Sequence, residues 1–487
     1  MNFTTAGAMR ARADNLARAS GSAEGTRCAT ISRVNITRRL AEFVACTSSS
    51  DIPPDARLQA RRALLDTLGV TLAGSNEDAS RIVASMIREQ GGVEESTVLG
   101  HGFQAPAAEA ALVNGTSGHA LDFDDVNSSM RGHPSVPLLP AVLAVAEKLG
   151  SSGRDVVDAF VLGFEVECKI GRLIGGPHYT LGWHPTSTFG TLGAAAACAR
   201  LLHLDADHTQ AALGVGASLA SGARRNFGSM TKPLHAGWAA RNGIVAAILA
   251  GRGFTADAEA LEAVDGWLNA ASGGTPVDPS PIGELGDPWE IVSPGIGVKL
   301  YPCCYFTHLA IDAALQLQLA LDGDITSVER IGVSVSPGTM MVLRKTLPES
   351  GLEGKFSMEY VVSAAVVDGG VSLGSFTDEA VARPEIRRLM ARVEVAEDGP
   401  RASAPLGGSA VVSVRFGEGE PLASPRVEVP RGDPQNPLSW EDLSQKFRDC
   451  AASTLEGSRV DKVISDLDKL DELADVRELM GNLAFNR

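Results

Sequence analysis

The sequence lacks any apolar run of the length that crosses a membrane. A spanning helix needs roughly 18 or more consecutive apolar residues, and the most apolar helical segments here carry Arg200 and Arg241. We therefore expect no membrane span.

Paired cysteines and the common catalytic motifs are also missing. The seven cysteines form no Cys-x-x-Cys pair and no zinc-type spacing, and their number is odd. This pattern is typical of a reduced, intracellular protein without a disulfide framework. There is no phosphate-binding loop, no Gly-x-Gly-x-x-Gly after a strand, no His-Glu-x-x-His and no Gly-x-Ser-x-Gly. We therefore predict no cofactor and no metal site.

The chain has fewer basic than acidic residues, which gives it a formal net charge of −16. Nucleic acid is excluded as a partner because phosphate backbones require a basic surface. An anionic substrate would need a local positive pocket instead. The segments that could supply it contain few acids apart from the Asp122 to Asp125 run, and they carry Arg131, His133, His184, Lys232 and His235.

Residues 1–35 differ in composition from the rest of the chain. They are rich in arginine, alanine, serine and threonine and contain few acids. Such a composition is typical of a disordered extension or of a mitochondrial transit peptide. We predict a cytoplasmic protein, with the mitochondrial matrix as the alternative.

The remaining chain, with 487 residues in all, is long enough for two domains. Helical patterns rich in Gly and Ala follow one another from Arg57 to Gly251, which indicates helices packed closely on one another. After Pro294 the pattern changes to alternating strands, at Val328–Val335 and in a hairpin of Val411–Phe416 with Arg426–Val429, with helices between them. From Pro434 the pattern is helical again. The sequence thus predicts a mostly α protein with an α+β module at 295–433.

Four polar segments stand out from the apolar, helical half. They are Asp122-Phe123-Asp124-Asp125, Arg131-Gly132-His133-Pro134-Ser135, Trp183-His184-Pro185-Thr186-Ser187 and Met230-Thr231-Lys232-Pro233-Leu234-His235. A proline just ahead of a helical pattern fits a helix entrance, where free backbone N–H groups favour an anion. The four segments therefore suggest one carboxylate-binding site assembled from several helix ends.

Together these segments resemble the MmgE/PrpD family. The resemblance extends from about Ile36 to the C-terminus and rests on five motifs in the family's order: His119-Ala120-Leu121-Asp122-Phe123-Asp124-Asp125, Gly132-His133-Pro134, Gly182-Trp183-His184-Pro185-Thr186, Thr231-Lys232-Pro233-Leu234-His235, and Tyr301-Pro302-Cys303-Cys304 with His308. The family includes 2-methylcitrate dehydratases, cis-aconitate decarboxylases and an iminodisuccinate epimerase. The resemblance implies that residues 36–294 and 434–487 form one all-helical domain, into which 295–433 is inserted as a lid over the site. It also implies a homodimer.

The resemblance places the catalytic positions at Asp122, His133, His184 and Lys232. Two histidines and a lysine can move a proton beside a carboxylate, because imidazole titrates near neutrality and an ammonium stabilises an enolate. Asp122 fits a general base. The acidic run alone would favour a solvated loop that caps the next helix, and a magnesium site is a third option.

The candidate substrate-binding residues are Arg131, His235, Cys304 and His308. Cys304 stands near a position where the resemblance implies a histidine in mammalian cis-aconitate decarboxylases, and His308 lies one helical turn later. Packing of the hinge is the other interpretation of Cys304.

We therefore predict a cofactor-independent lyase, a dehydratase or decarboxylase, acting on a small di- or tricarboxylate such as 2-methylcitrate or cis-aconitate. In a dehydratase, His184 or Asp122 would remove the proton next to a carboxylate, and His133 would protonate the leaving hydroxyl. One alternative is a dicarboxylate epimerase, which resembles this chain at Arg131–Ser135 and Gly182–Thr188. Another is a non-catalytic binding protein, which would have no need of titratable histidines beside a lysine.

Overall fold

The computed structural model describes residues 35–319, 327–344, 346–398, 408–417 and 419–484. The predicted N-terminal extension, residues 1–35, lies outside these residues except for its last position. The prediction of a mostly α fold is confirmed, because helices dominate and the strands form two small sheets. No described helix combines the length and the apolar character that a membrane crossing requires.

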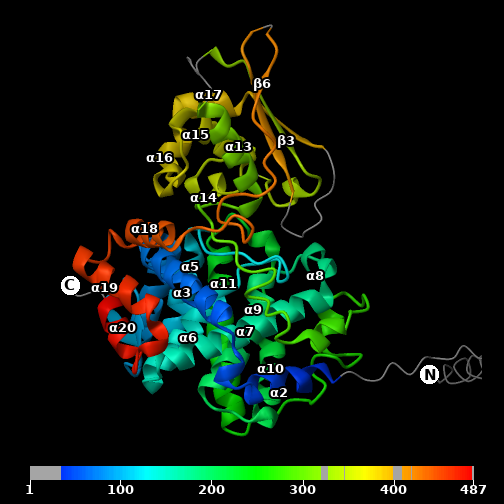
Figure 1. Ribbon diagram of the computed structural model, residues 1–487, viewed down its shortest axis with the longest axis vertical. Coiled ribbons are helices and arrows are strands. Elements are labelled where there is room, and N and C mark those ends of the chain that lie inside the picture. The colour runs from blue at the N-terminus through cyan, green and yellow to red at the C-terminus, as the bar shows by residue number, and fades with distance from the viewer. Residues whose placement is uncertain (1–34, 320–326, 345, 399–407, 418, 485–487) are drawn as a thin grey trace, which may run out of the picture. The chain divides into compact units, whose positions relative to one another are not determined.

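The N-terminal part of the chain folds into a layered bundle of helices (Figure 1). The helices are α2 (Ile36–Cys46), α3 (Pro54–Gly74), α4 (Asp78–Gln90), α5 (Ala107–Ala120), α6 (Ser135–Leu149), α7 (Gly153–Ile174), α8 (Gly176–Thr180), α9 (Pro185–Leu201), α10 (Ala206–Leu219), α11 (Thr231–Gly251) and α12 (Trp267–Ala271). Helix α11 packs against both α5 and α9, and α9 packs in turn against α6 and α7. The predicted succession of helices from Arg57 to Gly251 is thus confirmed.

Small residues let the central helices approach closely, as their spacing predicts. A Cβ atom on Gly237 of α11 would lie 2.2 Å from the carbonyl oxygen of Leu112 in α5, and one on Gly115 would lie 2.8 Å from the Cα of Gly237. No side chain fits such a crossing. The glycines therefore bring the start of α11 next to the end of α5, where two of the predicted site segments lie.

The α+β module is built on a four-stranded sheet with the order β4-β3-β5-β6. Its strands are β3 (Arg330–Val335), β4 (Val393–Glu397), β5 (Ala410–Arg415) and β6 (Leu422–Ala423), and its helices are α13 (His308–Leu319), α14 (Gly351–Gly354), α15 (Met358–Asp368), α16 (Asp378–Ala382) and α17 (Pro384–Met390). Strand β3 runs parallel to β4, with Val333 opposite Val395, and antiparallel to β5, with Val333 opposite Val412. The predicted alternation in β3 is confirmed, because Ile331, Val333 and Val335 are buried. Figure 1 shows the helices of this module gathered on one side of its strands.

The C-terminal helices return to the first part of the chain, as the family resemblance implies. They are α18 (Trp440–Ala451), α19 (Gly457–Asp468) and α20 (Arg477–Leu483), and α18 packs beside α3 (Figure 1). Lys446 of α18 forms a buried ion pair of 2.6 Å with Asp66 of α3. The same ammonium donates to the carbonyl oxygens of Phe123, at 2.8 Å, and Lys299, at 2.9 Å. The C-terminal segment therefore helps to hold two of the loops that form the site.

Three details differ from the sequence-based expectations. Strands β1 (Ser96–Val98) and β2 (Phe103–Ala105) form a two-stranded sheet within the part expected to be all helical. The partner of β5 in the predicted hairpin is Leu422–Ala423, whereas Arg426–Val429 contributes a single bridge, Val427 to Ala410. Helix α10 ends at Leu219, before the extended residue Ala220, although the helical pattern of the sequence continues to Ala223.

Residues Asn35–Arg487 form one compact unit. The division into 36–294 with 434–487 and 295–433 as separate domains stays a prediction.

Candidate active site

A cavity lies where helix ends of the bundle meet the α+β module. Its walls combine charged groups with aromatic and apolar side chains: Asp122, Val126, Arg131, Gly132, His133, Tyr179, His184, Phe227, Lys232, Cys304, Tyr305, Phe306, Val342 and Phe356. Six of the eight predicted site residues line it, and His235 and His308 do not.

Each catalytic candidate stands at a helix end. Asp122 follows α5, His133 lies two residues ahead of α6, His184 precedes Pro185 at the start of α9, and Lys232 is the second residue of α11. Prolines at these entrances hold the preceding histidines in position without costing a helical hydrogen bond. The four segments thus come together at one point, as the sequence suggested.

The carboxylate of Asp122 is surrounded by two ammonium groups. Its Oδ1 lies 2.5 Å from Nζ of Lys299 and 2.9 Å from Nζ of Lys232. Lys299 also donates to the Asp122 carbonyl oxygen at 2.9 Å, in a stretch where Asp122 has a φ of 51°. A non-glycine residue with a positive φ is unusual and is commonly held at functional sites. Lys299 therefore fixes both the backbone and the side chain of Asp122.

Lys232 is held by fewer hydrogen bonds than Lys299. Within the described part of the chain, its Nζ makes no aligned hydrogen bond, despite the short distance to Asp122. The rings of Phe227 and Phe356 each lie 5.3 Å from this ammonium. The N–H donors of Lys232 are thus available to a ligand in the cavity, in surroundings where aromatic rings favour a cation.

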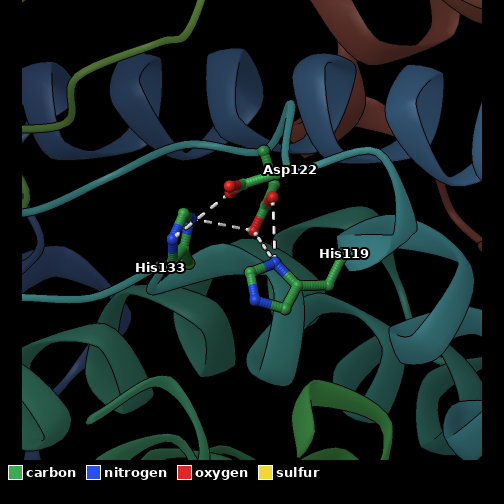
Figure 2. Close-up of side chains that lie close together, drawn as sticks. His119, Asp122 and His133 are labelled. Atoms are coloured by element: carbon green, nitrogen blue, oxygen red, sulfur yellow. Dashed lines mark hydrogen bonds and ion pairs between the residues drawn. The ribbon is translucent and has the colours of Figure 1, made fainter. Parts of the chain in front are cut away.

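Two histidines share the neighbouring carboxylate of Asp124. His119 Nδ1 lies 2.8 Å from Asp124 Oδ2, and His133 Nδ1 lies 3.2 Å from the same oxygen. His133 Nε2 lies 3.7 Å from Asp122 Oδ1, and Figure 2 shows His119, His133 and Asp122 converging. We refer to His119, Asp122, Asp124, His133, Lys232 and Lys299 as the Asp122 cluster.

Burial and charge set the protonation states of this cluster. Burial alone would raise the pKa of Asp122, but Lys232 and Lys299 outweigh it and hold this pKa well below its usual range. Burial lowers the pKa of His119 to about 3, and it also lowers the pKa of His133, although Asp124 opposes it. Near neutral pH the carboxylate of Asp122 is therefore ionised, and the imidazoles of His119 and His133 are neutral.

His184 and His235 form a pair of their own. Their Nδ1 atoms lie 3.0 Å apart, and both rings are buried. Burial lowers the pKa of His184 well below its usual range and the pKa of His235 to about 4. His184 lines the cavity while His235 does not, so His235 can act on a ligand through His184.

The two candidates from the α+β module are placed differently. Cys304 lines the cavity, and burial raises the pKa of its thiol to about 11, so the thiol is protonated. His308 is fully buried outside the cavity wall, with ring centroids 5.1 Å from Tyr301 and 5.0 Å from Tyr305. In this position His308 does not directly contact a ligand in the cavity.

Asp125 has a structural role, whereas Asp122 lines the cavity. Its Oδ1 accepts from the backbone N–H of Ser135, the first residue of α6, at 3.2 Å, and its Oδ2 accepts from the Ser135 hydroxyl. The capping interpretation of the acidic run thus holds for Asp125. The loop is buried, however, because Asp122, Asp124 and Asp125 are each at most 3% exposed.

Asp125 should make the protein less stable as the pH rises. Burial raises its pKa from 3.8 to about 8. Between these values the folded protein keeps a proton that the unfolded chain has released, so stability is lost as the pH rises through the folded pKa. Above the ordinary histidine pKa of about 6.5 the buried histidines are neutral in both states. We expect the melting temperature to fall between pH 6.5 and 8.5, and to fall less in Asp125→Asn.

Asp155 provides the control for this prediction. It forms the equivalent cap with Ser152 at the start of α7, but at the surface. Asp155→Asn should keep the wild-type pH dependence. Equal slopes for wild type and Asp125→Asn would show that Asp125 does not bind the proton.

His119, Asp122, Asp124 and His133 also lie within metal-binding reach of one another, with ligand atoms within 4.8 Å. The two ammonium groups beside Asp122 repel a cation at this place. The lysines therefore disfavour a metal ion and favour an anionic ligand.

Several site residues were not among the predicted ones. His119 belongs to a motif quoted above, and its position three residues before Asp122 was a usable signal. Lys299, Phe227 and Phe356 carry no such signal, because they come from irregular segments that only the folded chain brings together.

Models of one protein family match both parts of this chain. Residues 38–280 match the model of the MmgE/PrpD N-terminal domain, and residues 301–470 match that of the MmgE/PrpD C-terminal domain. The cis-aconitate decarboxylase of Mus musculus is 30% identical over 438 residues, covering 86% of this chain and 87% of the relative. That of Homo sapiens is 30% identical over 436 residues, covering 86% and 88%. The cis-aconitate decarboxylase of Aspergillus terreus is 28% identical over 480 residues, covering 92% and 96%.

Proposed function

The chain belongs to the MmgE/PrpD family, and on that basis we propose that it is a cofactor-independent lyase that decarboxylates a small unsaturated tricarboxylate, with cis-aconitate as the first candidate. The observation that carries the proposal is the cavity that Lys232, His133 and His184 line together. An ammonium beside two imidazoles suits a reaction in which negative charge develops on a carboxylate and a neighbouring carbon takes up a proton.

The reaction can be written with these groups. The bond between one carboxylate of cis-aconitate and its methylene carbon breaks, and carbon dioxide leaves. The electron pair moves through the double bond to the carbon next to a second carboxylate, which carries the developing charge. Lys232 stabilises that charge, and His133 or His184 delivers a proton to the carbon. The product is a dicarboxylate with a terminal methylene group.

The proton has to be acquired with the substrate. Burial lowers the pKa of both His133 and His184, so these rings are neutral near neutral pH. Carboxylates bound beside them would favour the imidazolium form. Substrate binding and protonation of the general acid are thus coupled in this proposal.

Dehydration of a 2-methylcitrate-like substrate is the second candidate. It is favoured by the presence of two imidazoles in one cavity, because dehydration needs both a base and an acid whereas decarboxylation needs only an acid. The same observation would suit epimerisation of a dicarboxylate. A non-catalytic binding protein is the remaining alternative.

Incubation with cis-aconitate, 2-methylcitrate and iminodisuccinate in deuterated water, followed by NMR, separates these chemistries. We expect loss of carbon dioxide from cis-aconitate with one deuterium in the product, unchanged after dialysis against EDTA. Water loss from 2-methylcitrate alone would establish the dehydratase, and deuterium exchange without net loss would establish the epimerase. Activity that EDTA removes and a divalent cation restores would overturn the cofactor-independent mechanism.

The homodimer and the cellular compartment stay predictions. Light scattering on the purified protein tests the first, and localisation of the full-length chain tests the second.

A further inference from the structure

Arg224 lies beside the cavity and bridges the two parts of the structure that form it. It begins the short helix η2 (Arg224–Asn226), and its backbone N–H donates to the carbonyl oxygen of Gly182 at 2.8 Å. Its Cζ lies 4.1 Å above the ring of Tyr179, which lines the cavity. Its Nη1 lies 3.3 Å from the sulfur of Met341, next to the cavity residue Val342. The guanidinium is therefore held at the edge of the cavity.

Arg131 approaches Tyr179 as well. It lines the cavity and lies close enough to Tyr179 for the two side chains to interact electrostatically. Its φ of 55° is unusual for a residue with a side chain, and the bridge between Asn127 and Gly132 holds it there. Among the residues that the structure describes, neither Arg131 nor Arg224 forms an ion pair with a carboxylate.

The Asp122 cluster does not by itself attract a polyanion. Its two ionised carboxylates, Asp122 and Asp124, are balanced by the two ammonium groups of Lys232 and Lys299. The formal charges of these two carboxylates and two ammonium groups cancel. The net attraction for a substrate with several carboxylates must therefore come from outside the cluster, and the arginines beside Tyr179 are in position to provide it.

We propose that Arg224 and Arg131, which both interact with Tyr179, form a second carboxylate-binding subsite at the edge of the cavity. This inference rests on the proposed function and deepens it. One carboxylate of the substrate binds at Lys232, and a distal carboxylate binds the guanidinium groups, which match its planar geometry. The subsite selects ligands with a third carboxylate over otherwise similar ligands that lack it.

Calorimetric binding of two saturated, unreactive ligands tests the subsite without requiring turnover. Tricarballylate has three carboxylates, and 2-methylsuccinate is the same skeleton without one terminal carboxylate. Arg224→Gln should weaken tricarballylate binding roughly tenfold or more, as for loss of a charge-assisted hydrogen bond, and should change 2-methylsuccinate binding less than about twofold. Arg224→Lys should restore part of the affinity.

Arg225→Gln is the matched control, because it removes the same charge one residue away at an exposed position. It should leave both affinities within about twofold of wild type, since an exposed charge is screened at physiological ionic strength. Equal effects of Arg224→Gln and Arg225→Gln, equal losses for the two ligands, or no binding of tricarballylate to the wild type would each overturn the subsite. Arg224-dependent binding without turnover of any tricarboxylate would support the subsite and overturn the decarboxylase proposal alone.

Discussion

Lys232→Ala is expected to lower kcat at least about 100-fold, the usual effect of removing a preorganised group that stabilises developing charge. Lys232 is the cavity-lining ammonium whose N–H donors make no aligned hydrogen bond in the described part of the chain. Removing it takes away the stabilisation of the transition state without opening the Lys299 ion pair with Asp122. The measurement is steady-state turnover of the substrate identified by NMR, with the melting temperature recorded on the same preparation.

Lys148→Ala is the control for general effects of losing a lysine. Lys148 forms a surface ion pair of 2.8 Å with Glu95, away from the cavity. Its loss should leave kcat unchanged. Near wild-type kcat in Lys232→Ala would exclude Lys232 from the chemistry, and a collapse in stability would assign it a structural role instead.

Lys299→Met should produce the opposite pattern, with a large loss of stability. Lys299 is fully buried and donates both to the side chain and to the carbonyl oxygen of Asp122. Breaking a buried pair from one side leaves an uncompensated charge and typically costs about 3 to 5 kcal/mol. We expect the free energy of unfolding, measured by urea denaturation, to fall by an amount in this range.

Lys148→Met gives the comparison for this second variant. Its ion pair has a similar distance but an exposed lysine, and such pairs contribute about 0 to 1 kcal/mol. If both variants lose the same small amount of stability, Lys299 does not hold the Asp122 backbone in place. The Lys232 and Lys299 variants together therefore separate the lysine that serves the substrate from the lysine that serves the fold.

The helical half of this fold and its polar helix ends were predictable from the sequence. Helices there are long and rich in small residues, and prolines fall in the first turns of α9 and α11, so His184 and Lys232 could be placed by local rules. Distinguishing Asp122 from Asp125 was beyond those rules. Both lie in one acidic run, and only the positions of Lys299 and Ser135 give one a charged partner and the other a capping role.

The residues contributed by the α+β module were harder to predict. Lys299, Cys304 and Phe356 come from irregular segments without periodicity, and their meeting with α11 and the Asp122 loop depends on contacts between parts far apart in sequence. His308 illustrates the same difficulty. Its spacing from Cys304 suggested a shared role, yet the chain passes through the short helix η4 (Tyr305–Thr307) between them and turns His308 in among tyrosine rings.

The contact between His184 and His235 has a further meaning for proton chemistry. When both rings are neutral, one Nδ1 must carry the hydrogen and the other must accept it, so the two rings are held in opposite tautomers. If His184 donates, its Nε2 is a base. If His235 donates, the Nε2 of His184 carries a hydrogen and is a potential acid. The shared proton can move over 3.0 Å from one Nδ1 to the other, and the two tautomers exchange when His184 also takes up a proton at Nε2 and His235 releases one from its own Nε2. The reactivity of His184, at the start of α9, therefore depends on His235 of α11 as well. His235 has this effect although it does not line the cavity.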